Sequence, residues 1–250
     1  MPRLWSRLRF NFQEDWQDKL LSGRTLLLGL HLQRAQNLPL DIGLHTVVEQ
    51  EITNTHPMMN LILSQSYRWR TVYARVCADA LTALANVRGF LPRLESIALV
   101  AGSYGIYEED EPWRTRSEGA SFLRFAPRLK SLSLHGFRCD DLTLPWDQLK
   151  ALKIDDSYFH AMSTNRLVQS LKKASSLSEC YFECMLDDED DDRPEVICHA
   201  TLGALTLNNI SNDDSDASFV ELLGSLRLPS LHTLTIQTLF HQHVCIAKLP

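Results

Sequence analysis

The chain has 250 residues, of which 44% are hydrophobic and 22% charged, and its formal net charge is −6 with a pI of about 5.8. This ordinary globular composition provides enough apolar residues for a sizeable core. Lys and Arg form no cluster of the kind that nucleic-acid-binding proteins carry, and every apolar run, 26–28 included, is far too short to cross a bilayer. The composition therefore favours a protein that binds neither nucleic acid nor membrane.

The cysteines and the first residues indicate the compartment. Six cysteines are scattered along the chain, and residues 1–12 alternate charged and aromatic side chains without the apolar segment of a secretion signal. Reduced thiols in a cytoplasmic or nuclear protein are therefore expected.

A short apolar pattern, L-x-x-L-x-L, recurs along the chain. Its last two apolar positions alternate with other residues, as in a strand with one buried face. In chain order, nine versions occur at Trp5/Leu8/Phe10, Leu27/Leu30/Leu32, Trp69/Val72/Ala74, Leu94/Ile97/Leu99, Leu129/Leu132/Leu134, Leu149/Leu152/Ile154, Leu177/Cys180/Phe182, Leu202/Leu205/Leu207 and Leu231/Leu234/Ile236.

Most of these versions follow one another at or near the period of about 20–29 residues that leucine-rich repeats have. The sequence therefore predicts an α/β fold, an irregular leucine-rich-repeat solenoid with a parallel sheet on one face and helices or loops on the other. We expect a single domain over residues 1–250 with about nine units and insertions near 33–66 and 101–121.

The two versions at 129–134 and 149–154 lie closest together, 20 residues apart. That spacing leaves almost no room for a helix between them. We therefore expect their strands to be parallel neighbours joined by a tight crossover. Asp140 and Asp141 would then lie near the rim, with Trp146 packed beneath it.

Several segments between the strands have the pattern of helices. Pro57 suits the first turn of a helix at 57–66, and further helices are predicted at 78–87 and 163–174. Ser218 and Glu221 form a capping box that starts another helix.

Other segments are expected to be strands, loops or end caps. There is room for an extra strand at 38–44, and 103–119 has the composition of a loop. The aromatic start of the chain does not resemble a polar cap, so further sequence is expected before Met1, and 236–248 is expected to cover the last unit.

Six phrases resemble fungal F-box-like leucine-rich-repeat proteins, in the order in which that family uses them. They are MPRLWS at 1–6, LPL at 38–40, YRWR at 67–70, LPRLES at 91–96, APRL at 126–129 and LPWDQL at 144–149. The resemblance implies the substrate-recognition region of an SCF ubiquitin ligase subunit, in which an F-box binds the Skp1 adaptor and the repeats hold a protein substrate.

The F-box itself would lie upstream of Met1 and does not occur in this sequence. Binding to the Skp1 adaptor is therefore expected only if an upstream F-box exists. The alternative is a stand-alone leucine-rich-repeat interaction module with no role in ubiquitin ligation.

No motif indicates an enzyme. The sequence has no phosphate-binding loop, no H-E-x-x-H and no nucleophile elbow. Two groups of possible metal ligands, Cys180/Cys184/Cys198/His199 and His232/His241/His243, match no metal-site spacing, so no metal or cofactor is expected.

The candidate partner-binding residues are two tryptophans and several acidic residues that follow predicted strands. Trp69 and Trp146 are interface candidates, although core packing is the alternative for both. If every strand points the same way, the acidic residues share one rim that attracts a basic protein, although solvated loops would look the same. The acidic candidates are Asp140, Asp141, Asp155, Asp156, Asp187, Asp188, Glu189, Asp190, Asp191 and Asp192.

Overall fold

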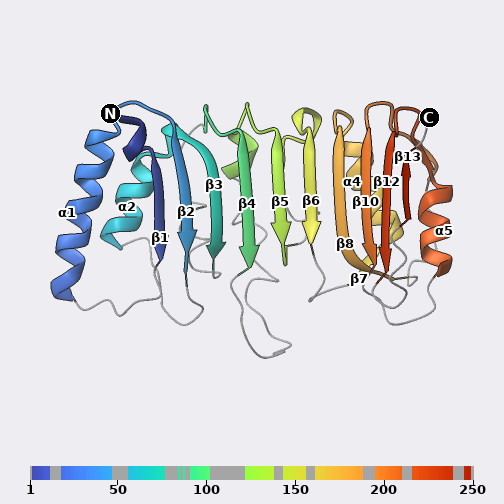
Figure 1. Cartoon of the computed structure of the whole chain (residues 1–250), viewed down its shortest axis with the longest axis horizontal. Coiled ribbons are helices and arrows are strands. Elements are labelled where there is room, and N and C mark those ends of the chain that lie inside the picture. Colours follow the sequence, from blue (N-terminus) through green and yellow to red (C-terminus); the bar gives the residue numbers. More distant parts are fainter. Residues whose placement is uncertain are drawn as a thin grey trace. The chain divides into compact units, whose positions relative to one another are not determined.

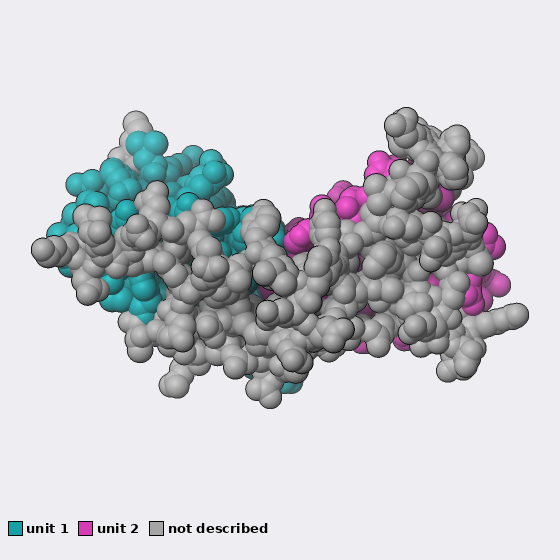
Figure 2. Space-filling model, turned by 90° about the horizontal axis from the view of Figure 1, so that it is seen from below, with its two compact units in different colours: residues 1–129, 141–145 teal, residues 130–140, 146–250 magenta. Residues whose placement is uncertain are grey.

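The structure is a computed structural model with a mixed α/β fold. It describes residues 2–11, 18–46, 56–76, 84, 87, 91–101, 122–137, 143–155, 161–187, 195–209, 216–238 and 245–248. The chain divides into two compact units, unit 1 (1–129 and 141–145) and unit 2 (130–140 and 146–250), which Figure 2 colours separately. The expected single domain stays a prediction.

Unit 1 contains a parallel sheet of strands β1, β2, β3 and β4, adjacent in that order (Figure 1). Its elements are η1 (Pro2–Trp5), β1 (Arg7–Asn11), α1 (Asp18–Arg34), β2 (Leu40–His45), α2 (Pro57–Ser64), η2 (Ser66–Arg68), β3 (Trp69–Val76) and β4 (Ser96–Ala101). One side of this sheet is apolar and buried. Leu8, Ile42, Val72 and Ile97 lie in register across the four strands, and all four are buried.

Unit 2 contains the parallel strands β5, β6, β8, β10 and β12, adjacent in that order, followed by the antiparallel β13. Its elements are β5 (Ser131–His135), η4 (Trp146–Gln148), β6 (Ala151–Asp155), β7 (Ala161–Ser163), α4 (Thr164–Lys173), β8 (Glu179–Asp187), β9 (Ile197–Cys198), β10 (Ala204–Asn209), α5 (Asp216–Gly224), β11 (Leu226–Arg227), β12 (Thr233–Thr238) and β13 (Cys245–Lys248). β7 pairs with β8, and β9 pairs with β11. α4 confirms the helix predicted at 163–174, and its Leu167, Val168 and Leu171 are fully buried.

The strongest sequence prediction concerned the strands at 131–135 and 151–155, and it is confirmed. β5 and β6 are parallel neighbours in which Leu132 lies opposite Leu152 and Leu134 opposite Ile154. The crossover between them holds the short η4, in which Trp146 is half-buried.

A backbone feature recurs at the start of the strands. In unit 2, the carbonyls of Lys130, Lys150, Ser178 and Gly203 each accept two successive amides from the start of the next parallel strand. These bonds join only main-chain atoms, so they fix the strands side by side whatever the side chains are.

The leucine that opens the apolar pattern is held in a turn. Its amide donates to the carbonyl three residues earlier at Leu94, Leu129, Leu149, Leu177 and Leu231. Leu94, Leu129, Leu149 and Leu177 are also fully buried. The first apolar position of the pattern therefore anchors a turn in the core, and the strand begins two residues later.

One predicted strand is wrong. Leu27, Leu30 and Leu32 belong to helix α1, and the second strand of unit 1 is β2, at the place where the sequence left room for an extra strand. The buried residues there are Leu28, Leu32 and Ala35, which follow helical spacing, whereas Leu27 and Leu30 are exposed. A helix forms here rather than a strand because the helical period places Leu28, Leu32 and Ala35 on one continuous buried face.

The remaining predicted elements agree in part. α2 begins at Pro57 as expected and ends at Ser64. α5 begins at Asp216, so Ser218 lies inside the helix rather than at its cap. Of the helix predicted at 78–87, the structure describes the buried Leu84 and Val87, and the loop predicted at 103–119 lies outside the described residues. β13 pairs with β12 where a covering segment was expected.

Candidate functional site

The candidate site is the side of each sheet that lies opposite the buried apolar residues, called here the open face of each unit. Strand side chains alternate between the two sides of a sheet, so every second residue belongs to the open face. In β5, for example, Leu132 and Leu134 are buried, whereas Ser131, Ser133 and His135 are partly exposed. Within the strands, a partner can therefore contact these outward residues, whereas the alternate residues are enclosed.

The open face of unit 2 presents polar side chains in rows across the strands. One row is Ser133, Lys153, Tyr181, Thr206 and Thr235, and the next is His135, Asp155, Glu183, Asn208 and Gln237. Residues facing each other across parallel strands are about 5 Å apart, so each row is a continuous line of polar groups.

Side-chain contacts connect residues both within these rows of unit 2 and between them. The Asp155 carboxylate lies 3.0 Å from Nδ1 of His135 and 3.9 Å from Nζ of Lys153. The same Lys153 ammonium lies 4.4 Å from the centre of the Tyr181 ring. Asp155, one of the predicted partner-binding residues, therefore already has partners within its own sheet.

Tyr181 is the aromatic centre of this face. Its hydroxyl donates to the Glu183 carboxylate, two residues along the same strand. Burial and this hydrogen bond raise the pKa of Tyr181 to about 12, although a hydrogen bond from Asn208 acts in the opposite direction. The phenol therefore stays neutral at physiological pH and offers an aromatic ring beside carboxylates.

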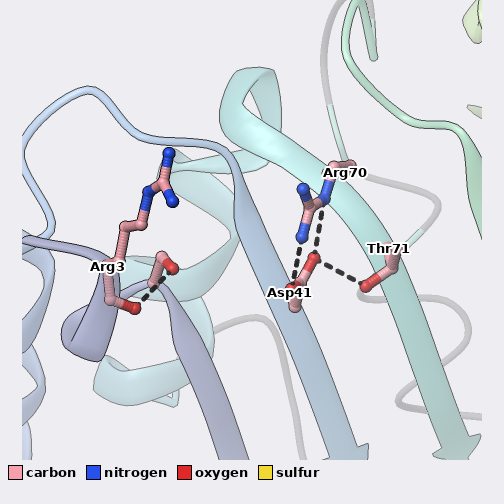
Figure 3. Close-up of polar contacts among 5 residues, drawn as sticks. Arg3, Asp41, Arg70 and Thr71 are labelled. Atoms are coloured by element: carbon pink, nitrogen blue, oxygen red, sulfur yellow. Dashed lines mark hydrogen bonds and ion pairs between the residues drawn. The ribbon is translucent and has the colours of Figure 1, made fainter.

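The open face of unit 1 contains a closed ion-pair cluster (Figure 3). Arg70 Nη2 donates to Asp41 Oδ2 at 2.7 Å, and Arg70 Nε donates to Oδ1 at 3.1 Å. The Thr71 hydroxyl donates to the same Oδ1 at 2.9 Å. This bidentate arrangement is the strongest geometry that an arginine and a carboxylate form.

The charges in this cluster shift one another's pKa values. Burial acts to raise the pKa of Asp41, but the hydrogen bonds from Arg70 and Thr71, together with the positive charges of Arg70 and Arg7, hold it below its usual value. The hydrogen bond and charge of Asp41 in turn raise the pKa of Arg70. Asp41 is therefore fully ionised at neutral pH, and Arg70 is committed to it.

The two central residues of the YRWR phrase at 67–70, Arg68 and Trp69, are buried and have a structural role. Trp69 is fully buried in the core of unit 1, so it presents no surface to a partner. Arg68 is also buried, and it donates from Nε to the Leu38 carbonyl at 3.1 Å and from Nη1 to Gln65 at 2.8 Å. These bonds attach the start of β3 to the segment that leads into β2.

The other predicted site residues are only partly described. Trp146 is half-buried in η4, and Nζ of Lys173 lies 5.9 Å from the centre of its ring. Asp187 is the last residue of β8, at the same edge of the parallel sheet as Asp155. The remaining acidic candidates lie outside the described residues: Asp140, Asp141, Asp156, Asp188, Glu189, Asp190, Asp191 and Asp192. The acidic rim thus stays a prediction.

The possible metal ligands that the structure describes lie in different environments. Cys180 is buried on β8, Cys198 is exposed, and His199 is buried with Nε2 2.9 Å from the Ala174 carbonyl. Nowhere in the described ranges do three or more His, Cys, Asp or Glu residues converge as metal ligands would.

An apolar groove of about 680 Å³ lies along α1, beside the start of α2. It is lined by Leu21, Leu26, Leu30 and Pro57, among others, and Leu26 is 66% exposed. Within the described parts of the chain, no helix is both long enough and apolar enough to span a membrane.

Sequence reasoning missed the open-face residues. Tyr73, Lys153 and Tyr181 each stand between two apolar residues of a strand, which is the signal that identifies them. What the sequence lacked was the register that aligns them from strand to strand.

Comparisons with known proteins add no relative. A scan against protein-family models found no match. Searches of curated proteins and of solved structures also found none. The functional argument therefore depends on the residues of this chain.

Proposed function

We propose that this chain is a leucine-rich-repeat protein-binding module, in which the open faces of its parallel sheets hold a partner protein. The observation that carries the proposal is the division of each sheet into a buried apolar side and an outward side of aligned polar and aromatic residues. Sheets buried on both sides read as continuous apolar runs, whereas these strands alternate.

The repeated backbone contacts support the solenoid interpretation. The same turn precedes five of the strands, and the same paired amide contacts recur at each step from β5 to β12. A repeat protein is expected to show such nearest-neighbour contacts, because each unit packs only on the units beside it.

Within this class, the ordered phrases that resemble F-box-like proteins favour the substrate-recognition region of an SCF ubiquitin ligase subunit. The alternative is an interaction module without a ligase role. Neither role needs catalytic residues, and the protein is proposed to be non-enzymatic.

Site-specific photo-crosslinking tests the protein-binding function. A benzophenone amino acid replaces Tyr73 or Tyr181, which lie on the open faces, or Tyr67, which lies in η2 outside the strands. Tyr67 is a matched control for Tyr73 because both side chains are 50% exposed. We expect one protein to be crosslinked from Tyr73 or Tyr181 and not from Tyr67, and to bind the purified chain. Equal crosslinking from all three positions would contradict the proposal.

A second experiment separates the two roles. Transcripts that extend upstream of Met1 are sequenced, and their product is tested for co-purification with the Skp1 adaptor alongside the present chain. The ligase role requires F-box helices in the longer product and adaptor binding by that product alone. A transcript without F-box helices favours the stand-alone module.

A further inference from the structure

Helix α1 of unit 1 is apolar on its outer side as well as on the side that faces its own unit. Leu28 and Leu32 are buried, whereas Leu26, Leu27 and Leu30 are 66%, 58% and 38% exposed. A surface helix ordinarily carries polar residues on its outer side, and a helix that is apolar all round is covered all round. Three exposed leucines within two turns form one patch, so we expect another surface to cover this side of α1.

The apolar groove along α1 lies beside these leucines. Helical spacing places Ser22, Thr25 and Gly29 on one strip of the helix and Leu26 and Leu30 on the adjacent strip, and all five line the groove. A ridge of leucines therefore lies next to a strip of small residues. Packed helices interlock in this way, with the side-chain ridge of one helix in the groove of the other.

Packing within the chain does not account for the glycine at position 29. A Cβ atom placed on Gly29 meets no described atom outside the helix backbone within 4 Å. Glycine inside a helix is nevertheless less favourable than alanine. A helix that packs on the groove from outside would account for it, because a residue without a side chain lets two helix backbones approach closely.

The middle of α1 carries no formal charge. Residues 25–33 contain no Asp, Glu, Lys or Arg, and His31 packs edge-on against Trp5 with the ring centres 4.7 Å apart. A charged segment would lose its hydration in this groove without meeting an opposite charge. The groove therefore fits an uncharged apolar helix surface, and α1 itself presents such a surface.

We infer that the outer side of α1 is a self-association surface, in which the Leu26 and Leu30 ridge of one copy of this chain packs into the groove beside Gly29 of a second copy. One helix carries both the ridge and the groove, so a two-fold axis lets both copies use the same residues, as a symmetric dimer requires. α1 covers Asp18–Arg34, and its midpoint is Leu26. An antiparallel pair of these helices therefore brings the two Leu26 residues close to the axis. α1 belongs to neither open face, so the dimer and the proposed protein-binding function are independent.

The area of this contact predicts a weak and reversible dimer. α1 has 17 residues, so it is about 25 Å long, and its diameter is about 10 Å. Two such helices side by side bury on the order of 1,000 Å² in total, which is near the lower limit for a specific interface. Two copies that each have a formal net charge of −6 also repel one another. We therefore expect a dissociation constant of about 10–500 μM.

Sedimentation velocity of the full chain tests the inference over concentrations of about 5–500 μM. We expect the sedimentation coefficient to rise from that of a monomer towards that of a dimer and not beyond, because a two-fold contact closes on itself. Added salt should preserve or strengthen the association, since the contact is uncharged and salt screens the repulsion between the copies. A monomer at every concentration, or growth beyond the dimer, would overturn the inference.

Two variants locate the contact on α1. Leu26→Glu places a charge near the axis, and Gly29→Leu fills the groove. Each is expected to weaken dimerisation at least about tenfold. Gly29→Leu should leave the urea midpoint of unfolding at or above that of the wild type, because leucine favours a helix more than glycine does. A loss of dimerisation in this variant therefore cannot be ascribed to misfolding.

Matched controls for both variants lie on α5 of unit 2. Val220→Glu changes an apolar residue that is 70% exposed, close to the 66% of Leu26. Gly224→Leu repeats the glycine change at a position where a Cβ atom also meets nothing within 4 Å. Both should leave dimerisation within about twofold of the wild type. Losses as large as those of the α1 variants would contradict the assignment.

A mixing experiment adds a gain of association. Leu26→Glu and Leu26→Lys are each expected to be monomeric alone. Mixed in equal amounts, they should form a heterodimer at least about tenfold tighter than either variant forms with itself, because the opposite charges meet near the axis. If the mixture stays monomeric, contact between two α1 helices is refuted.

Discussion

The alternation of buried and outward residues on β5 yields a sharp test of the strand register. Leu134 is fully buried opposite Ile154, whereas its neighbour Ser133 faces the open side. Leu134→Ala removes several buried carbons and leaves a cavity, so we expect the free energy of unfolding to fall by about 2–5 kcal/mol. Ser133→Ala removes only a hydroxyl group from a partly exposed position, so its effect is expected within about 0.5 kcal/mol.

Urea unfolding followed by far-UV circular dichroism measures both values. A loss of about 3 kcal/mol lowers the midpoint by about 1 M or more, since the slope for small proteins is about 1–3 kcal/mol per M. The pair Ile154→Ala and Lys153→Ala on β6 repeats the comparison across the ladder, because Ile154 is fully buried and Lys153 is exposed.

A shift of the register by one residue would exchange the two faces of a strand. If Ser133→Ala or Lys153→Ala destabilises the protein as much as its buried neighbour does, the pairing of β5 with β6 is wrong. If all four variants stay within about 0.5 kcal/mol, the core assigned to this part of unit 2 is wrong.

Three further predictions concern titratable groups. The pKa of Asp41 is lower in the folded state than its unfolded value of about 3.9. The ionised carboxylate therefore stabilises the folded protein fully above about pH 3.9, and this stabilisation is lost as the pH falls through the folded pKa. Asp41→Asn should therefore lower the free energy of unfolding by about 1 kcal/mol at pH 7, and the difference from wild type should vanish in acid urea titrations. The pKa of Tyr181 is raised to about 12 in the folded state. The neutral phenol therefore stabilises the folded protein below the unfolded pKa of about 10, and this stabilisation is lost as the pH rises through about 12. Tyr181→Phe should remove the last phase of a spectrophotometric tyrosine titration. An unchanged titration would contradict the environment described for Tyr181. His199→Ala removes the buried contact with the Ala174 carbonyl and should cost about 1–2 kcal/mol in urea unfolding, whereas His232→Ala, at an exposed position, should stay within about 0.5 kcal/mol.

Most strands could be predicted because the apolar pattern carries two signals. Alternation identifies the strand, and the leucine two residues ahead of it anchors the turn. The pattern failed at Leu27, Leu30 and Leu32, where leucines are so dense that both the strand period and the helical period fit. Only the packing of Leu28 and Leu32 in the core separates the two.

β2 escaped the pattern for a local reason. Its Leu40, Ile42 and Leu44 alternate and are buried, but Pro39 stands where the other units have a leucine or tryptophan. An insertion that contains α2 also separates it from the next strand. The sequence showed the alternation of β2, but not its place beside β1 and β3 in the parallel sheet.

The candidate site was harder to predict than the fold. Tryptophans and acidic runs are conspicuous in a sequence, but Trp69 lies in the core and Asp155 is paired within its sheet. The residues of the open faces become a site only when the register places Arg9 in one row with Tyr73, or Lys153 beside Tyr181. Register depends on long-range pairing, which a single sequence does not specify.

The main-chain contacts that join one strand to the next have a consequence for evolution and design. Because the carbonyls of Lys130, Lys150 and Ser178 hold the following strands without any side chain, outward residues are free to change while the stack persists. Outward residues such as Thr206 or Thr235 can therefore be exchanged row by row at little cost in folding, and the proposed binding preference of the face would change with them.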